Sequence, residues 1–219
     1  MHELTFLGSD SGFGKNNTSA YFTIKEKFIL IDCGMTVFNK VIDLIKNYKE
    51  LDIIITHLHN DHAGSLSQLI QYNYFVLGNK TQVISECVHI KDYLDITGTP
   101  VESYTVIPST DYCKLIKTYH DKRIDSYGML LNINNKKIIY TGDTNTIEPF
   151  LPYTDSINEL YIDMSKGNEV HLGINDCMDV LDEIKSKGVN IYLIHTDDLE
   201  YLKNATNGKY TIIKEELCQ

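Results

Sequence analysis

A run of apolar, β-forming residues that leads directly into a cluster of histidines and aspartate constrains this chain more than any other feature. Ile53-Ile54-Ile55-Thr56 has the pattern of a buried strand, and His57-Leu58-His59-Asn60-Asp61-His62 follows it without a break. A strand that ends in a polar loop is a good support for a site, because the rigid scaffold fixes where the side chains begin. The chain is therefore expected to build a sheet with a functional loop at one strand end.

Four side chains of this segment are of the kinds that bind metal ions: His57, His59, Asp61 and His62. Imidazole and carboxylate together suit Zn²⁺, Mn²⁺ or Fe²⁺, and the absence of cysteine from the segment disfavours a closed structural zinc site. A single histidine is usually structural, but chance spacing is a poor explanation for so many ligands at one strand end. The segment therefore predicts a metal centre.

The composition is that of an ordinary globular protein. Of the 219 residues, 42% are hydrophobic and 23% are charged, which indicates a single domain over residues 1–219 with one substantial core. The five cysteines form no C-x-x-C pair, so neither a disulfide framework nor a zinc ribbon is expected. No stretch approaches the roughly 20 apolar residues of a membrane helix, and the N-terminus lacks a secretory pattern. We therefore expect a cytoplasmic protein that does not enter a membrane.

The charge of the chain bears on its partners. The formal net charge is −10, which works against broad binding to a phosphate backbone. The nearest basic cluster contains Lys114, Lys117, Lys122 and Arg123, and we interpret it as a solvated face. The charge therefore disfavours nucleic acid as a partner without excluding it, and a homodimeric state is left open.

Short strand patterns alternate with helical ones along the chain. The expected strands are Leu4–Leu7, Ala20–Ile24, Phe28–Ile31, Ile53–Thr56, Gly128–Ile133, Lys137–Tyr140, Leu160–Ile162 and Ile191–Ile194. Helical periodicity covers Val37–Tyr48 and Asp176–Lys187, the second with Asn175 as its expected N-cap and Gly188 after its end. Asn134-Asn135 predicts a hairpin turn. The order favours a layered fold of mixed α and β structure.

The pattern His-x-His-x-Asp-His at a strand end resembles the metal-binding motif of the metallo-β-lactamase superfamily. The further ligands of that family follow singly, each after a later strand, as a histidine, a bridging aspartate and a last histidine. His120, Asp143 and His195 stand in this order here, and each ends an apolar run. The resemblance spans Gly8 to His195 and implies an α+β fold, an αββα sandwich of two mixed β-sheets flanked by helices.

The resemblance also implies two divalent metal ions, with Zn²⁺ as the first expectation and Mn²⁺ or Fe²⁺ as alternatives. The ligands would divide into His57, His59 and His120 at one ion, Asp61, His62 and His195 at the other, and Asp143 between them. Two such ions share a hydroxide nucleophile, lower its pKa and neutralise charge on the attacked group. Asp61 would in addition act catalytically, by orienting that hydroxide or accepting its proton.

The residues around the third histidine narrow the branch of the superfamily. Thiolester hydrolases and lactonases usually carry Gly-His-Thr-Pro-Gly-His there, whereas this chain has His120 followed by Ser126-Tyr127-Gly128. This spacing is similar to that of ribonuclease Z and its phosphodiesterase relatives. The glycine-rich opening Gly8–Gly12 and the segment Asn16–Ser19 resemble the same branch.

His171 is the second candidate catalytic residue. The phosphodiesterase branch keeps a histidine in this region, and the resemblance implies that His171 stabilises charge or protonates the leaving group. A histidine of a surface loop is the plainer alternative. Glu169, two residues earlier, is a candidate to orient the ring.

The departures from the branch also matter. No basic, glycine-rich arm of the kind that grips tRNA in long ribonuclease Z enzymes is visible between Ser65 and Thr118. We therefore predict a dinuclear hydrolase that acts on a small phosphodiester. The alternatives are a superfamily hydrolase of lactones, thiolesters or β-lactams, ribonuclease Z-like processing of tRNA 3′ ends, and a metal-binding sensor without catalysis. An oxygen-reducing di-iron protein would be expected to have glutamate in place of His59.

Overall fold

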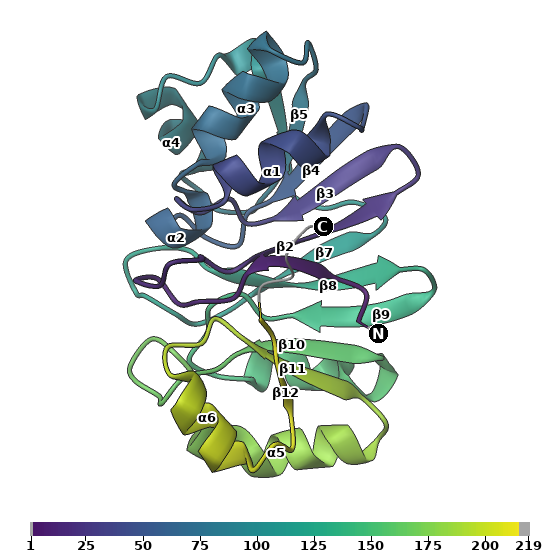
Figure 1. The fold of residues 1–219 in the computed structure, drawn as a ribbon, viewed down its shortest axis with the longest axis vertical. Helices are drawn as coiled ribbons and strands as arrows, with labels where there is room; N and C mark the ends of the chain where they lie inside the picture. Colours follow the sequence, from purple (N-terminus) through teal and green to yellow (C-terminus); the bar gives the residue numbers. More distant parts are fainter. Residues whose placement is uncertain (1, 215–219) are drawn as a thin grey trace. The chain divides into compact units, whose positions relative to one another are not determined.

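The computed structural model describes residues 2–214, which form two compact units (Figure 1). The first unit extends to Ser109 and takes up the chain again at Lys214, and the second unit is Thr110–Ile213. Each unit is built on one six-stranded sheet. No described helix is both long enough and apolar enough to cross a bilayer.

The sheet of the first unit follows the order of the sequence, β1-β2-β3-β4-β5-β6. Its strands are β1 (Thr5–Gly8), β2 (Ser19–Ile24), β3 (Lys27–Ile31), β4 (Glu50–Ile54), β5 (Thr81–Ile84) and β6 (Tyr104–Ile107). The β1–β2 and β2–β3 pairs are antiparallel, and the pairs from β3 to β6 are parallel. Parallel neighbours need crossover connections, which explains why the helices of this unit follow β3.

The helices of the first unit bury one face each. They are α1 (Phe38–Ile45), α2 (Asn60–Ala63), α3 (Leu66–Phe75) and α4 (Ile90–Ile96), with a 3₁₀ turn at Val101–Ser103. In α1 the buried residues Val41 and Ile45 lie four positions apart, so both point to the same side of the helix. Strand β4 is buried from Leu51 onward, as expected for a strand inside a parallel sheet. This strand leads into the histidine segment.

The sheet of the second unit has the order β12-β11-β10-β9-β8-β7. Its strands are β7 (Cys113–Lys117), β8 (Tyr127–Ile133), β9 (Lys136–Tyr140), β10 (Glu159–Asp163), β11 (Asn190–Ile194) and β12 (Thr211–Ile212). The β7–β8 and β8–β9 pairs are antiparallel, and the pairs from β9 to β12 are parallel. Each unit is therefore a mixed sheet.

A single apolar cluster holds the helices of the second unit to its sheet. These helices are α5 (Ile174–Ser186) and α6 (Leu199–Thr206), which lie side by side, and the 3₁₀ segment Glu148–Ser156 (Figure 1). Leu160 and Ile162 of β10 belong to the same buried cluster as Leu181 and Ile184 of α5. Alternate residues of a strand point to opposite faces, so Tyr161 and Asp163 of β10 lie on the other side of the sheet.

Local sequence signals were confirmed at turns and were wrong at one helix start. Asn134 and Asn135 have φ of 51° and 64°, which are the left-handed values that a tight hairpin needs. Gly188 ends α5 with a φ of 88°, as predicted. The helix begins earlier than predicted, however, with Gly173 at its N-cap, and Asn175 lies inside it, where its Nδ2 donates to Tyr201 Oη at 3.1 Å. The apolar Ile174 extends the buried stripe by one turn, and burial outweighs the capping preference of asparagine.

The remaining differences concern element ends and short elements. Helix α1 ends at Ile45, before the predicted Tyr48, and β4 begins at Glu50 and ends before Thr56. Strands β5, β6, β7 and β12 and helices α3, α4 and α6 carry patterns that were not assigned from the sequence. Two of these strands, β5 and β6, have only four residues each, which is too short for a clear alternation of apolar and polar positions.

Candidate metal centre

The predicted ligands of the first unit lie together around α2. His57 is fully buried, and its Nε2 lies 3.0 Å from Nδ1 of His59. The rings of His57 and His62 are 4.1 Å apart between centroids, and His62 Nε2 lies 3.2 Å from Oδ2 of Asp61. Histidine nitrogens and a carboxylate thus converge on a small volume at the end of β4.

A buried carboxylate that the sequence analysis did not identify supports this group. Asp32 follows β3, and its Oδ2 lies 2.8 Å from Nδ1 of His62. Its two oxygens also accept from the amide and the hydroxyl of Thr56, both at 2.8 Å. Burial raises the pKa of the Asp32 carboxyl, against the lowering effect of His62 and Thr56. A histidine that donates from Nδ1 presents Nε2 as its ligating atom, so Asp32 fixes the orientation that a metal requires.

Backbone contacts hold the ligand segment in place. The amide of Cys33 donates to the carbonyl of His62 at 2.6 Å, and the amide of Met35 donates to the carbonyl of Asn60 at 3.1 Å. A Cβ on Gly34 would collide with the carbonyl oxygen of Asp61, so only glycine allows this close approach. The loop after β3 is therefore shaped to receive α2.

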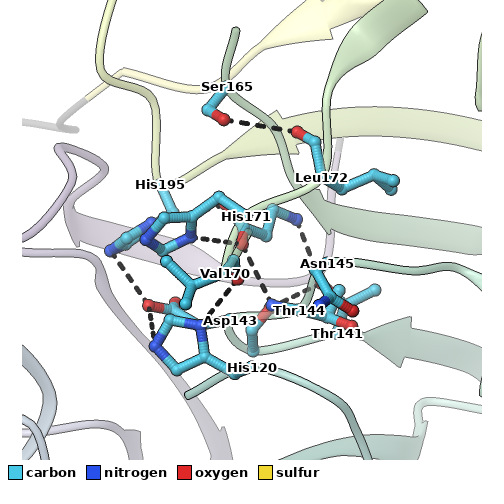
Figure 2. Close-up of polar contacts among 12 residues, drawn as sticks. His120, Thr141, Asp143, Thr144, Asn145, Ser165, Val170, His171, Leu172 and His195 are labelled. Carbon is cyan, nitrogen blue, oxygen red and sulfur yellow. Dashed lines mark hydrogen bonds and ion pairs between the residues drawn. The ribbon is translucent and has the colours of Figure 1, made fainter. Parts of the chain in front are cut away.

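The predicted ligands of the second unit come from three different strand ends. His120 follows β7, Asp143 follows β9 and His195 follows β11, and all three are at least 92% buried. Nε2 of His120 lies 3.7 Å and Nε2 of His195 lies 3.4 Å from the same oxygen, Oδ2 of Asp143 (Figure 2). His195 has a left-handed φ of 54°, a conformation that only a well-packed surrounding maintains in a non-glycine residue. One carboxylate thus stands between two imidazoles.

The loop that carries Asp143 is fixed by hydroxyl groups. Thr118 Oγ1 and Ser126 Oγ donate to the carbonyl of Asp143 at 3.3 Å and 3.2 Å. Both side chains are buried, so these bonds are shielded from water. Ser126 belongs to the Ser-Tyr-Gly segment that the sequence analysis singled out, and this contact gives the segment a structural role.

His171 lies beside the ligands of the second unit, and its partner is Asp163. Nδ1 of His171 is 2.8 Å from Asp163 Oδ2, while the ring centroids of His120 and His195 are 4.9 Å and 5.0 Å from its own (Figure 2). Burial lowers the pKa of His171, but the hydrogen bond and charge of Asp163 outweigh it, so the pKa is raised overall. The suggestion that Glu169 orients His171 was wrong, because the Glu169 side chain is exposed and the buried carboxylate of Asp163 takes that place.

Asp163 supports a second histidine as well. Its Oδ1 lies 3.4 Å from Nδ1 of His195, and its Oδ2 accepts from the amide of Thr144 at 3.0 Å. His120 is oriented differently, because its Nδ1 lies 2.7 Å from the carbonyl oxygen of Val170. In both predicted ligand histidines an oxygen faces Nδ1, at 2.7 Å in His120 and 3.4 Å in His195, and the opposite nitrogen, Nε2, is directed toward Asp143.

These donors fit a divalent metal ion. Within the second unit, His120, Asp143 and His171 each offer a ligand atom within 4.8 Å of the others. Neutral imidazole and carboxylate suit Zn²⁺, Mn²⁺ and Fe²⁺, and oriented Nδ1 atoms are typical of metal-binding histidines. The four ligands at the end of β4 are of the same kinds.

Two residues of the basic cluster noted in the sequence are paired with acidic residues. Arg123 forms an ion pair with Asp121, and Lys117 forms one with Asp125. Lys114 lies over the ring of Tyr153, 5.7 Å from its centroid. This pairing reduces the positive field that the cluster could offer a polyanion.

Several known proteins are similar in sequence to this chain. A model of the family described as Anti-Pycsar protein Apyc1 matches residues 2–92. The Anti-Pycsar protein Apyc1 of Bacillus phage 010DV004 is 26% identical over 90% of this chain and 89% of its own length. A ribonuclease Z of Sulfolobus acidocaldarius is 27% identical over 62% of this chain and half of its own.

The similarity in structure extends over the whole chain. The metallo-β-lactamase fold protein YhfI from Bacillus subtilis superposes with a TM-score of 0.78, covering 98% of this chain and 97% of its own at 17% identity. The chain therefore has the metallo-β-lactamase fold, and the predicted α+β class is confirmed.

Proposed function

We propose that this protein is a dinuclear phosphodiesterase that opens the ring of a cyclic nucleotide. The relatives called Anti-Pycsar proteins degrade a cyclic nucleotide, and a cyclic nucleotide is a small phosphodiester, the substrate class expected from the sequence. The observation that carries the proposal is the His171–Asp163 pair at 2.8 Å beside the buried ligand Asp143. This pair supports the proposal because cleavage of an alkyl phosphodiester requires a proton donor beside the metal site, and His171 would be that donor.

The metal ligands of the proposal are those expected from the superfamily resemblance. The set is His57, His59 and His120 for one ion, Asp61, His62 and His195 for the other, and Asp143 shared between them. Two bound divalent ions would supply neutralisation of the phosphate charge and activation of water. Zn²⁺ is the ion that we would test first, with Mn²⁺ and Fe²⁺ as alternatives.

The side chains of the protein then have separate tasks. Asp61 orients the attacking water and accepts its proton, and its Oδ2 lies 3.2 Å from Nε2 of His62, the ligating atom of the neighbouring proposed ligand. Asp163 holds Nδ1 of His171, so Nε2 is the atom that delivers a proton. The water oxygen bonds to phosphorus, the ring P–O bond breaks, and the proton of His171 passes to the departing ribose oxygen. The product is a linear nucleoside monophosphate.

The experiment that tests the proposal is a substrate comparison with the metal-loaded protein. Purine and pyrimidine cyclic mononucleotides would be assayed beside bis(p-nitrophenyl) phosphate, a lactone and a thiolester, with metal content measured by elemental analysis. We expect turnover of both kinds of phosphodiester, with the cyclic nucleotides giving linear monophosphates. Turnover of the lactone or the thiolester without turnover of any phosphodiester would overturn the proposal.

A further inference from the structure

We propose that Asn145 is a positioning residue that holds the proton donor His171 at a fixed place relative to the ligand His120. Asn145 lies two residues after Asp143, in the loop that follows β9. It is neither a predicted ligand nor a proton donor. The inference rests on the proposed function, because it concerns the residue that donates the proton there.

Asn145 joins two segments that are far apart in the sequence. Its amide donates to the carbonyl of Tyr119 at 2.7 Å, and Tyr119 directly precedes His120. Its side-chain Nδ2 donates to the carbonyl of Glu169 at 2.8 Å, two residues before His171. One residue therefore ties the backbone that carries the ligand to the backbone that carries the donor.

Two other contacts hold the loop that contains His171, the proposed proton donor. Neither can be removed as cleanly as the bond from Asn145. The carbonyl of Val170 lies 2.7 Å from Nδ1 of His120, and the amide of Leu172 donates to the carbonyl of Thr144 at 2.8 Å. The first involves a ligand side chain, and the second involves only backbone. The bond from Asn145 Nδ2 to Glu169 is made by a side chain without another role, so it can be deleted while the ligand set stays intact.

A small displacement of the donor has a large effect on rate. General acid catalysis requires the donor within hydrogen-bond reach of the leaving oxygen, and a misplacement of about 1 Å can cost up to about 100-fold. Val170 and Leu172 would still hold the loop after loss of the Asn145 bond. We therefore expect a decrease in kcat of about tenfold for a substrate that needs the proton.

The leaving group separates a positioning role from a general structural role. The ribose oxygen of a cyclic nucleotide leaves as a poorly stabilised alkoxide and needs a proton. The p-nitrophenolate of bis(p-nitrophenyl) phosphate is a weak base and leaves without one. A misplaced His171 therefore slows the first substrate much more than the second, whereas a damaged metal site slows both.

The experiment compares Asn145→Ala and Asn145→Asp, which both remove the Nδ2 donor, with Asn145→Gln, which keeps an amide donor. Asn175→Ala is the matched control, since Asn175 is an asparagine of the same unit whose side chain also makes one hydrogen bond, to Tyr201 at 3.1 Å. We expect kcat for the cyclic nucleotide to fall about tenfold in Asn145→Ala and Asn145→Asp, with KM within about twofold. Bis(p-nitrophenyl) phosphate turnover, metal content and Tm should stay close to wild type, and Asn145→Gln should recover part of the loss.

Equal losses on the two substrates, or no loss on either, would overturn the inference. Amide hydrogen exchange gives a readout that does not depend on turnover: the amides of residues 168–172 should exchange faster in Asn145→Ala than in wild type or Asn175→Ala. Unchanged exchange there would also overturn it. His171→Ala, measured in parallel, tests the proposed function separately. An equal loss on both substrates in that variant would reject the donor role of His171, whatever Asn145 does.

Discussion

The two units contain buried aspartates that support histidines in different ways. Asp32 follows β3 in the first unit, and Asp163 ends β10 in the second; neither is exposed to solvent. Oδ2 of Asp32 lies 2.8 Å from Nδ1 of one histidine, His62. The two carboxylate oxygens also accept hydrogen bonds from the amide and the hydroxyl of Thr56. Oδ2 of Asp163 lies 2.8 Å from Nδ1 of His171, the predicted proton donor, and its Oδ1 lies 3.4 Å from Nδ1 of His195, a predicted ligand. The first carboxylate contacts one predicted ligand alone, whereas the second contacts both a predicted ligand and the proposed proton donor.

The units also differ in how they collect their ligands. The first unit supplies His57, His59, Asp61 and His62 from one continuous segment. The second collects His120, Asp143 and His195 from three strand ends, and each needs its own backbone support. A segment can be recognised in the sequence, whereas a set of strand ends is joined only by the sheet. Variants in each unit test this difference.

The largest effect is expected at Asp61, the proposed base of the first unit. Asp61→Ala should reduce turnover of the cyclic nucleotide at least about 1,000-fold, because it removes both a ligand and the group that accepts the proton. Leu58→Ala is the control, since Leu58 lies in the same segment without a ligand atom, and it should mainly lower Tm. Steady-state kinetics and thermal denaturation measure the two effects. Similar residual activity in the two variants would contradict the assignment.

The next effect distinguishes the proton donor of the second unit from its ligands. His171→Ala should lower kcat for the cyclic nucleotide by about 100-fold or more while metal content survives. His195→Ala should lose metal as well as activity, because Nε2 of His195 is directed at Asp143, 3.4 Å away. Elemental analysis measures the metal content of each variant, and steady-state kinetics on the same preparations measure its kcat. Metal loss in His171→Ala would make that residue a ligand.

Changes of the two buried aspartates should weaken metal binding by about 10- to 100-fold each, the usual effect of removing a partner of a ligand histidine. Asp32→Asn should weaken binding without changing the dependence of rate on the leaving group. Asp163→Asn should change both, because it also releases His171. Competition with a chelator measures the affinity, and the pair of phosphodiesters measures the rates. If the two variants showed the same metal affinity and the same dependence of rate on the leaving group, the proposed difference between Asp32 and Asp163 would be rejected.

The smallest effect concerns pH. The pKa of His171 is raised because Asp163 outweighs the lowering effect of burial, so the protonated donor persists to higher pH than an ordinary histidine would. The rate for the cyclic nucleotide should therefore fall as pH rises through that raised pKa, and Asp163→Asn should move the fall to lower pH. The stability from this pair follows the same sign: it is fully present below the unfolded-state pKa and is lost as pH rises through the folded one. A pH–rate profile that does not move in the variant would argue against this pairing.

Much of the fold and of the ligand set could be predicted because the signals are local. The apolar run before His57 predicted a strand end, and β4 ends within three residues of it. Asn134 and Asn135 predicted a turn because asparagine tolerates a positive φ. The first residue of α5 was wrong because burial of Ile174, a tertiary effect, decided where the helix begins.

The sequence by itself determined which residues are candidates to carry the chemistry, since ligand type, order and placement after apolar runs are all local properties. Tertiary structure alone decided how those residues are oriented. Asp32 and Asp163 each follow an apolar run, and nothing in the chain near them indicates that His62 or His171 is their partner. Such pairs are set by which strands become neighbours and by how deeply a carboxylate is buried, and both are properties of the whole sheet.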